Sequence, residues 1–240
     1  MFLSNEGSRL ATSDVNFTVI DIINEVQRKL GLNTTTFLDD NKLTTVLLDF
    51  LNDVIDEVSD YGDWPHMFRE INVTAVSSVG SYEIAVSSQV KNIYEVHFDT
   101  QVAPLEVRTV EDLRRLQKLA SFGTPRQFAL VDVSGVNPRI RVYPIPGTPQ
   151  DGLLFDVAYF KKPSLYTTVT ADSTARTGFP SRMLVQGVYA KALLEESGEE
   201  PTNQYQIAYA EYQRMRKEAL NRFTSDSGTD IYIQPIGGHF

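Results

Sequence analysis

The chain contains two hydrophobic patterns, and the change between them divides it into three parts. Near both ends, apolar residues recur every three or four positions, which is typical of amphipathic helices. Residues 69–160 instead contain short stretches in which apolar and polar side chains alternate, as in half-buried strands. The pattern therefore predicts helices at both ends of the chain and a β-rich region between them.

The first helix is predicted over residues 18–30. An apolar stripe follows Thr18, and the spacing of Thr18 and Asp21 is that of a capping box. Gly31 follows the last position of the stripe, where glycine commonly ends a helix.

The second helix has the most regular pattern. It is predicted to begin after Asp39 and Asp40, whose negative charges would interact favourably with the positive N-terminal end of the helix dipole. It is expected to end at Gly62 and Pro65. Spacings of three and one alternate along its apolar side, which indicates one broad buried face. The apolar positions are Leu43, Val46, Leu47, Phe50, Leu51, Val54, Ile55 and Val58.

The middle region predicts several short strands. Apolar and polar residues alternate within stretches 69–76 and 82–86, which lie on either side of the turn sequence SSVGS. This pattern predicts a β-hairpin. Thr109 and Asp112 suit a capping box for a single helix over 109–120. The stretch 153–160 is apolar on both faces, so its sheet is expected to be covered on both sides. The other strands are expected at 93–98, 102–107, 126–133 and 139–144.

Helical periodicity returns after a polar stretch at 163–178, which is rich in Ser and Thr and predicts a linker. Helices are predicted over 179–198 and 203–223. The apolar stripe of the second consists of Tyr205, Ala208, Tyr212, Met215, Ala219 and Phe223.

These elements predict an α+β fold in three parts. Residues 1–66 and 175–223 are expected to form a discontinuous helical bundle, built from the N- and C-terminal helices. An antiparallel β-sandwich-like domain, residues 67–174, is inserted into it, and residues 224–240 form an extended C-terminal arm.

Composition narrows the functional classes. The formal net charge of −9 argues against a nucleic-acid binder that works by neutralising phosphates. The chain has no cysteine, which excludes disulfides and thiolate chemistry. No apolar run approaches the length of a membrane span, and the N-terminus lacks the pattern of a secretory signal, so we expect neither.

Catalytic patterns are scarce. The three histidines, His66, His97 and His239, lie far apart in different kinds of segment, and no P-loop or dinucleotide-type glycine loop occurs. We therefore predict no catalytic residues, no metal and no cofactor.

Two sets of charges remain open to interpretation. Four aspartates recur opposite the apolar face of the second helix: Asp49, Asp53, Asp56 and Asp60. They are a solvated face, a carboxylate site, or a surface that meets basic residues of a neighbouring copy. The middle helix offers such a basic surface through Arg114, Arg115 and Lys118. In a ring of copies, Asp53 and Asp56 would pair with it.

Aromatic residues raise similar alternatives. Trp64, the single tryptophan, is either an exposed platform for a sugar or partner, or a packed hinge between the helical and β-rich parts. Tyr209 lies beside the buried stripe of the last helix and is a candidate interface residue.

The end of the sequence, DIYIQPIGGHF, is unusually apolar for so short a segment. It either packs back on its own domain or serves a partner. In the second case the binding residues are Ile231, Tyr232, Ile233, Pro235, Ile236 and Phe240.

The order of these parts resembles a known family. A helix closes on YGDWPHMFRE, strands end in RIRVYPIPG and LLFDVAYFKKPSLYTT, and the helices FPSRMLVQGVYAKALLEESGEE and YQIAYAEYQRMRKEALNRF follow. This arrangement, over about residues 18–223, is similar to that of the portal-to-tail adaptors of short-tailed bacteriophages. These are also called head-completion or connector proteins, and include the tail accessory factors and tail tubular protein A.

The resemblance implies a structural protein of the virion without enzymatic activity. Such adaptors form a ring, commonly dodecameric, beneath the portal protein; the ring extends the DNA channel and docks the tail nozzle or tail tube protein. The partners implied are therefore the portal, neighbouring adaptor subunits and a tail protein. Such adaptors reach the portal with an extended C-terminal arm, so the resemblance favours the partner for the segment DIYIQPIGGHF. DNA only passes through, no membrane is involved, and assembly takes place in the host cytoplasm. The alternatives are a tail-associated cell-wall hydrolase that uses the acidic helix, or a carbohydrate-binding module with exposed aromatics around Trp64 and Tyr94.

Overall fold

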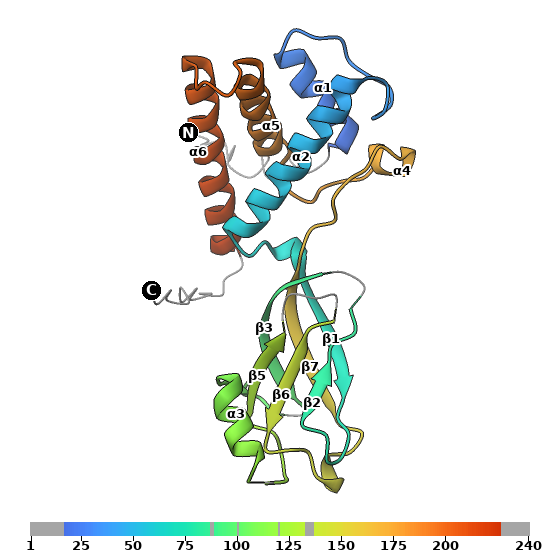
Figure 1. Cartoon of the computed structure of the whole chain (residues 1–240), viewed down its shortest axis with the longest axis vertical. Helices are drawn as coiled ribbons and strands as arrows, with labels where there is room; N and C mark the ends of the chain where they lie inside the picture. The colour runs from blue at the N-terminus through green and yellow to red at the C-terminus, as the bar shows by residue number, and fades with distance from the viewer. Residues whose placement is uncertain (1–16, 87–88, 100, 120, 133–136, 227–240) are drawn as a thin grey trace, which may run out of the picture. The chain divides into compact units, whose positions relative to one another are not determined.

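The computed structural model describes residues 17–86, 89–99, 101–119, 121–132 and 137–226. The chain divides into two compact units, which are visible in Figure 1. Met1–Gly62 and Leu165–Phe240 belong to the helical unit, and Asp63–Ser164 form the β unit. The described residues contain six α-helices and two sheets, so the predicted α+β class is confirmed.

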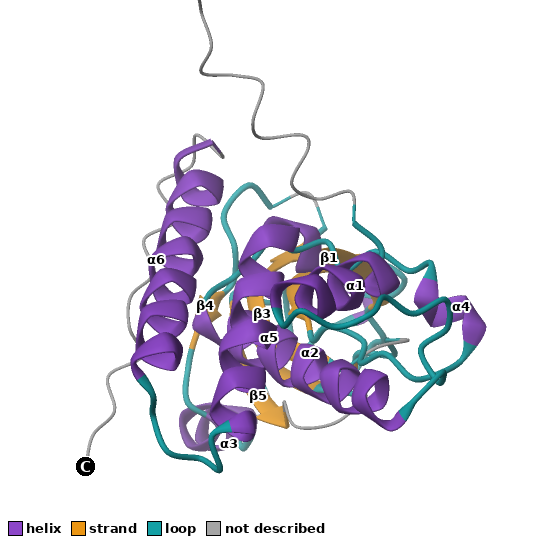
Figure 2. Ribbon diagram, turned by 90° about the horizontal axis from the view of Figure 1, so that it is seen from above, coloured by secondary structure: helices purple, strands orange, loops and turns teal. Residues whose placement is uncertain are grey.

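Helix α5 is central to the helical unit. It packs against α1, α2 and α6, and Figure 2 shows it between α6 and the α1–α2 pair. Buried residues occur all round α5, as expected for a helix surrounded by others. The helices of this unit are α1 (Val19–Lys29), α2 (Lys42–Tyr61), α4 (Thr170–Ser173), α5 (Ser181–Glu196) and α6 (Asn203–Asp226).

The first helix begins and ends as predicted. The Thr18 hydroxyl accepts from the Asp21 backbone N–H (3.3 Å), and the Thr18 N–H donates to the Asp21 carboxylate (3.0 Å), which completes the capping box. Gly31 follows with φ of 73°, a left-handed conformation that glycine adopts at no steric cost.

The second helix begins differently from the prediction. Asn41 is its N-cap, and the Asn41 side chain accepts from the Thr44 N–H (2.9 Å). The Asp40 carboxylate instead accepts from the N–H groups of Thr36 and Phe37 (2.8 and 2.9 Å) in the preceding loop. These bonds and one from the Thr35 hydroxyl, the largest contribution, lower the pKa of Asp40.

The buried face of α2 is also slightly rotated from the predicted one. Leu47, Leu51, Val54, Ile55 and Val58 are buried as expected. Leu48, which the pattern omitted, is also buried, whereas Leu43 is exposed. The reason is that α2 packs against both α1 and α5, which widens its contact face on one side.

The stretch predicted as a polar linker is anchored to the helical unit. It contains α4, and the Val19 N–H donates to the Ala175 carbonyl (3.0 Å). The Asn52 side chain of α2 binds both the N–H and the carbonyl of Tyr166 (2.9 and 2.8 Å). The linker prediction is therefore wrong for residues 166–176, because backbone hydrogen bonds that a polar composition does not reveal hold the segment in place.

The β unit contains two sheets. One has the strand order β1-β7-β3 and the other β2-β6-β5-β4, with antiparallel pairing except between β4 and β5. Helix α3 (Val110–Gln117) packs against β5 and β6. The remaining elements are η1 (Pro65–Met67), β1 (Phe68–Thr74), β2 (Ser81–Glu83), β3 (Val90–Phe98), β4 (Glu106–Val107), β5 (Gln127–Asp132), β6 (Arg139–Tyr143), η2 (Thr148–Gln150) and β7 (Leu154–Lys161).

The predicted hairpin between residues 69–76 and 82–86 is wrong. Strand β1 pairs with β7 and strand β2 pairs with β6, so the turn leads from one sheet to the other. The Tyr82 hydroxyl holds this crossing together, accepting from the Val76 N–H (3.1 Å) and donating to the Val79 carbonyl (2.8 Å). A local turn signal does not specify which strand becomes the partner.

One buried cluster joins the two sheets into a sandwich. The ring of Phe155 from β7 lies 4.7 Å from Phe98 in its own sheet and 4.9 Å from Tyr82 in the other. The opposite face of β7 is covered only in its second half, where Phe160 packs against Phe68 (5.5 Å), while Leu154 is exposed. The two-sided covering predicted for this strand therefore holds for that half alone.

Candidate assembly surfaces

The acidic face predicted on α2 lies on the surface of the helical unit. Asp49, Asp53, Asp56 and Asp60 are all exposed. Asp53 pairs with Lys191 of α5 (3.4 Å), while the side chains of the other three form no ion pair with any residue that the structure describes. Because surface pairs contribute little to stability, this face is free to serve a partner.

Helix α6 carries both internal and external contacts. Arg216 is largely buried, pairs with Glu57 of α2 (2.6 Å) and lies 4.0 Å above the ring of Tyr61. Such a contact fixes α6 on α2 by charge and by cation–π attraction. The outward Arg214 bridges Glu211 and Glu218 (2.6 and 2.5 Å) along the helix.

The tyrosines near the start of α6 are arranged in a ladder. Tyr205 stacks on Tyr209 (5.6 Å between centroids, 18° between planes), and Tyr209 contacts Tyr212 at 6.1 Å. Tyr212 is buried, Tyr205 is half-buried and Tyr209 is exposed. Tyr209 is therefore an exposed aromatic side chain, supported by Tyr205 and Tyr212, that is open to a partner.

The basic surface predicted on the middle helix lies on the β unit. Leu113 is fully buried, and the Gln117 side chain donates to the carbonyls of Gly80 (2.9 Å) and Val142 (3.0 Å), which fixes one side of α3. Arg114, Arg115 and Lys118 lie on the exposed side and form no ion pair with the described residues.

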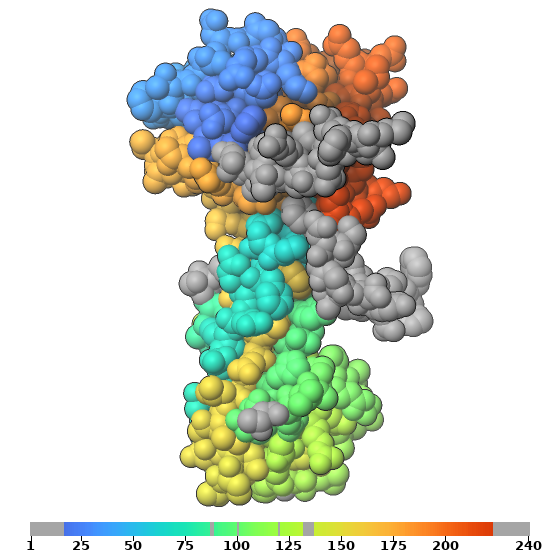
Figure 3. Space-filling model, turned by 180° about the vertical axis from the view of Figure 1, so that it is seen from behind, coloured from blue at the N-terminus to red at the C-terminus, as the bar shows by residue number. Residues whose placement is uncertain are grey.

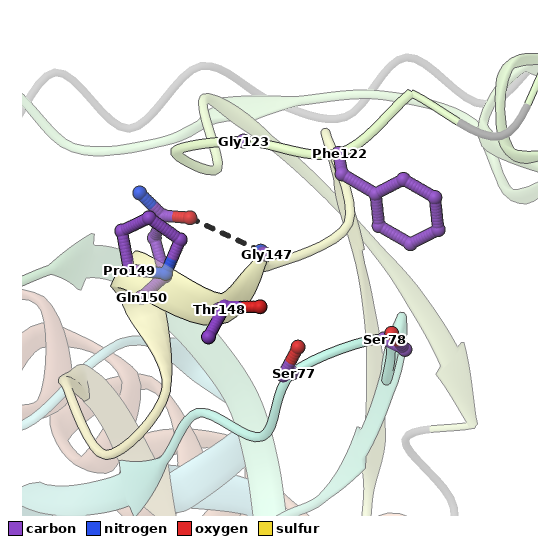
Figure 4. Close-up of a pocket in the computed structure, with 8 residues that line it drawn as sticks. All are labelled: Ser77, Ser78, Phe122, Gly123, Gly147, Thr148, Pro149 and Gln150. Atoms are coloured by element: carbon purple, nitrogen blue, oxygen red, sulfur yellow. Dashed lines mark hydrogen bonds between the residues drawn. The ribbon is translucent and has the colours of Figure 1, made fainter.

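A hollow that the sequence did not indicate lies next to α3. It has a volume of about 470 Å³ and is lined by Ser77, Ser78, Phe122, Gly123, Gly147, Thr148, Pro149 and Gln150. Figure 4 shows the Phe122 ring and the side chains of Ser77, Ser78 and Thr148 around the same open space. The apolar residues at 119 and 122 within otherwise polar loops were the only signal of it in the sequence.

Hydrogen bonds hold the walls of this hollow in place. The Gln150 side chain accepts from the Gly147 N–H (3.1 Å), and the Ser78 N–H donates to the Pro146 carbonyl (2.8 Å). The Gly123 N–H donates to the Ile145 carbonyl (2.9 Å), which ties the loop after α3 to the loop after β6. The hollow is therefore built before any partner arrives.

The histidines do not form a common site. His97 lies near Glu95 (3.4 Å), and burial, together with the charges of Lys161 and Arg69, lowers the pKa of His66 to about 4. His239 lies outside the described residues. In the part of the chain that the structure describes, no group of three or more acidic or histidine side chains is placed to hold a metal ion.

The two aromatic residues predicted as a binding platform differ in their exposure to solvent. Trp64 is fully buried, so it cannot stack on a sugar, which corrects that alternative. Tyr94 is exposed, but its ring packs on Phe160 and Phe68 of its own sheet (6.1 and 6.5 Å).

The predicted binding residues of the C-terminal segment lie outside the described residues. They are Ile231, Tyr232, Ile233, Pro235, Ile236 and Phe240. Within the described residues, each helix is too short or too polar to cross a membrane.

These features define a two-part α+β protein with open surfaces suited to protein contacts. Residues 17–235 match the model of the SU10 adaptor protein family. Because the match spans most of the sequence, the chain belongs to this family and is a bacteriophage structural adaptor. This is a family of structural adaptors and not of enzymes, and it implies partners of the portal and tail region and a place in the virion. No curated protein matches the sequence.

Proposed function

We propose that the chain is a head-to-tail adaptor that forms a ring beneath the portal, extends the DNA channel and docks the tail. The observation that carries the proposal is the match to a phage adaptor family over residues 17–235. The dodecameric state follows from the resemblance to portal-to-tail adaptors of short-tailed phages. The net charge of −9 suits a channel component, because like charge discourages tight contact with passing DNA.

The C-terminal segment is the proposed contact with the portal. Ile231, Tyr232, Ile233, Pro235, Ile236 and Phe240 place many apolar side chains in a short stretch. Such a segment gains stability only where another surface buries it, for example as an added strand with side chains in pockets. We propose that the portal provides that surface.

The acidic face of α2 and the exposed Tyr209 of α6 are the proposed contacts with neighbouring adaptors. Asp49, Asp56 and Asp60 are exposed and form no ion pair with the described residues, while Asp53 forms an ion pair with Lys191. Exposed charges of this kind direct association and fix its register more than they add affinity. The aromatic side chain adds contact area at small entropic cost.

Mixing the full-length protein with purified portal tests the proposal. Sedimentation should show adaptor bound to portal, and replacing Ile231, Ile233 and Phe240 by Ser should weaken binding by at least about tenfold, because buried apolar anchors dominate such contacts. The matched control replaces polar residues of the same segment, Ser227, Thr229 and Gln234, by Ala and should bind normally. If the apolar variant binds portal normally but melts at a lower temperature, the segment packs on its own chain and the proposal is wrong.

Ring formation has a separate test. In the presence of portal, Asp53→Lys with Asp56→Lys should reduce the number of adaptors that bind. The control, Glu195→Lys on α5, is also exposed. An unchanged stoichiometry for the double variant would remove the acidic face from the interface.

A further inference from the structure

We infer that the β unit carries a docking site for an acidic segment of another protein, whose apolar side chain fills the hollow beside Phe122. The site combines the hollow with the basic surface of α3. This inference goes beyond the portal contact and the ring. It assigns Arg114, Arg115 and Lys118 to a different partner from the neighbouring copy considered above.

A hydrogen bond and the polypeptide itself connect α3 to the loops that line the hollow. The Gln117 amide at the end of α3 donates to the Gly80 carbonyl, directly after the loop that contributes Ser77 and Ser78. Lys118 and Leu119 follow immediately along the chain, and Phe122 forms a parallel bridge with Ile145. Figure 3 shows yellow atoms, the colour of residues near 150, beside green and yellow-green atoms, the colours of residues near 110–140, in the lower part of the view.

Exposed apolar residues lie in the same loops as the residues that line the hollow. Phe122, which lines it, is 56% exposed, Leu119 three residues earlier is 72% exposed, and Val76 and Val79 flank the lining residues Ser77 and Ser78. Single exposed apolar residues need no explanation, but several around a preformed hollow are typical of an interaction site.

Charge complementarity identifies the partner as acidic. Arg114, Arg115 and Lys118 share one end of α3 and find no acid among the described residues, although the chain as a whole carries a net charge of −9. Asp151, which follows the lining residue Gln150, accepts from the Ser77 N–H (2.8 Å) and so holds the loop in place. An acidic segment with an aromatic or large aliphatic residue would satisfy both parts of the site.

The inner polar groups of the hollow suit a peptide. The hydroxyls of Ser77, Ser78 and Thr148 border the same space as the Phe122 ring. Hydroxyls both donate and accept, so they can bind the backbone of a segment whose side chain lies against the ring. Because the walls are already held by hydrogen bonds, little ordering is needed on the adaptor side.

Selection of peptides by the lone subunit tests the inference without portal or ring. The immobilised full-length protein is offered a displayed library of random peptides, and the enriched peptides are synthesised. We expect them to combine Asp or Glu with an aromatic or large aliphatic residue. Their affinity should fall at least about tenfold with Phe122→Ser, about fivefold with Arg114→Glu, Arg115→Glu and Lys118→Glu together, and also as salt is added.

Two matched variants serve as controls. Val169→Ser removes an apolar residue of the helical unit with the same 56% exposure as Phe122, and Lys217→Glu reverses an exposed charge of α6. Both should bind the peptides like the unmodified chain. If Phe122→Ser lowers the melting temperature, Leu119→Ser replaces it.

Three outcomes overturn the inference. Enrichment of basic or charge-free peptides contradicts an acidic partner. If the Phe122→Ser and Leu119→Ser variants bind the enriched peptides as tightly as the unmodified chain does, the hollow is excluded as the binding site. If reversing the three α3 charges reduces adaptor stoichiometry on the portal and leaves peptide binding unchanged, the basic surface faces a neighbouring copy. If the unmodified chain fails to bind portal, this result contradicts the proposed function and leaves the peptide-docking site standing.

Discussion

The two units use their charged residues differently. In the helical unit, two cations join neighbouring helices: Lys29 of α1 donates to Gln186 of α5 (2.7 Å), and Arg216 of α6 pairs with Glu57 of α2. In the β unit, Lys91 pairs with Asp63 and Arg139 with Glu83, whereas the exposed cations of α3 form no ion pair with the described residues. The α3 cations are therefore the ones to which a charged partner would add most.

The two cores differ as well. The helical unit depends on close approach, since a Cβ at Gly187 of α5 would lie 2.8 Å from Val54 and 3.0 Å from Tyr212. The β unit depends on large aromatic side chains between its sheets, with Phe155 at the centre. Enlarging a residue should therefore damage the first core, and shrinking one should damage the second.

Phe155→Ala should have the largest effect. The side chain is fully buried between Phe98 and Tyr82, so its loss should lower the free energy of unfolding by about 3–5 kcal/mol. Urea unfolding followed by the fluorescence of Trp64, a buried residue of this unit, measures it. The neighbouring exposed Leu154→Ala should cost far less, and equal losses would contradict the assigned core.

Acid should destabilise the β unit through His66. Its pKa of about 4 lies below the ordinary 6.5, so in this range the unfolded chain binds the proton more readily. The stabilising contribution is complete above pH 6.5 and is lost as the pH falls towards 4, by about 3 kcal/mol in total. His66→Gln should remove this part of the pH dependence, as read by Trp64 fluorescence, whereas His97→Gln should retain it. Identical profiles of stability against pH for wild type and His66→Gln would disprove the role of His66 in acid destabilisation.

Gly187→Ala tests the close approach in the helical unit. In an exposed helix this change is stabilising, but here the added methyl group must push α5 away from α2 and α6. We expect a net loss of about 1–3 kcal/mol, measured by helix ellipticity in urea. Glu195→Ala, at an exposed position of the same helix, is the control, and a stabilising Gly187→Ala would refute the tight contact.

The smallest effect should come from the surface pair of α2. Asp53 is 63% exposed beside Lys191, so Asp53→Asn should change stability by less than about 0.5 kcal/mol. Glu57→Gln should cost more, because its partner Arg216 is only 12% exposed. If the two substitutions have equal effects on the urea midpoint, the helical unit does not depend on its internal pairs as described.

Local signals predicted the elements well but not their partners. The Thr18 capping box and the helical stripes were readable because each depends on residues three or four positions apart. The hairpin prediction failed at SSVGS, since strand pairing is decided by which distant segment buries the same face. The hollow beside Phe122 was missed for the same reason, because three loops far apart in the sequence build it.

The sequence alone determined the ends of the first helix, the α+β class, the acidic face of α2 and the exposure of α3's basic side chains, because periodicity and short-range hydrogen bonds govern these. Tertiary structure decided that β1 and β2 lie in different sheets, that Trp64 is buried, and that Asp53 meets Lys191. It also decided that α3 lies beside a hollow. Each of these depends on long-range packing, in which burying apolar surface outweighs the local preference of any one segment.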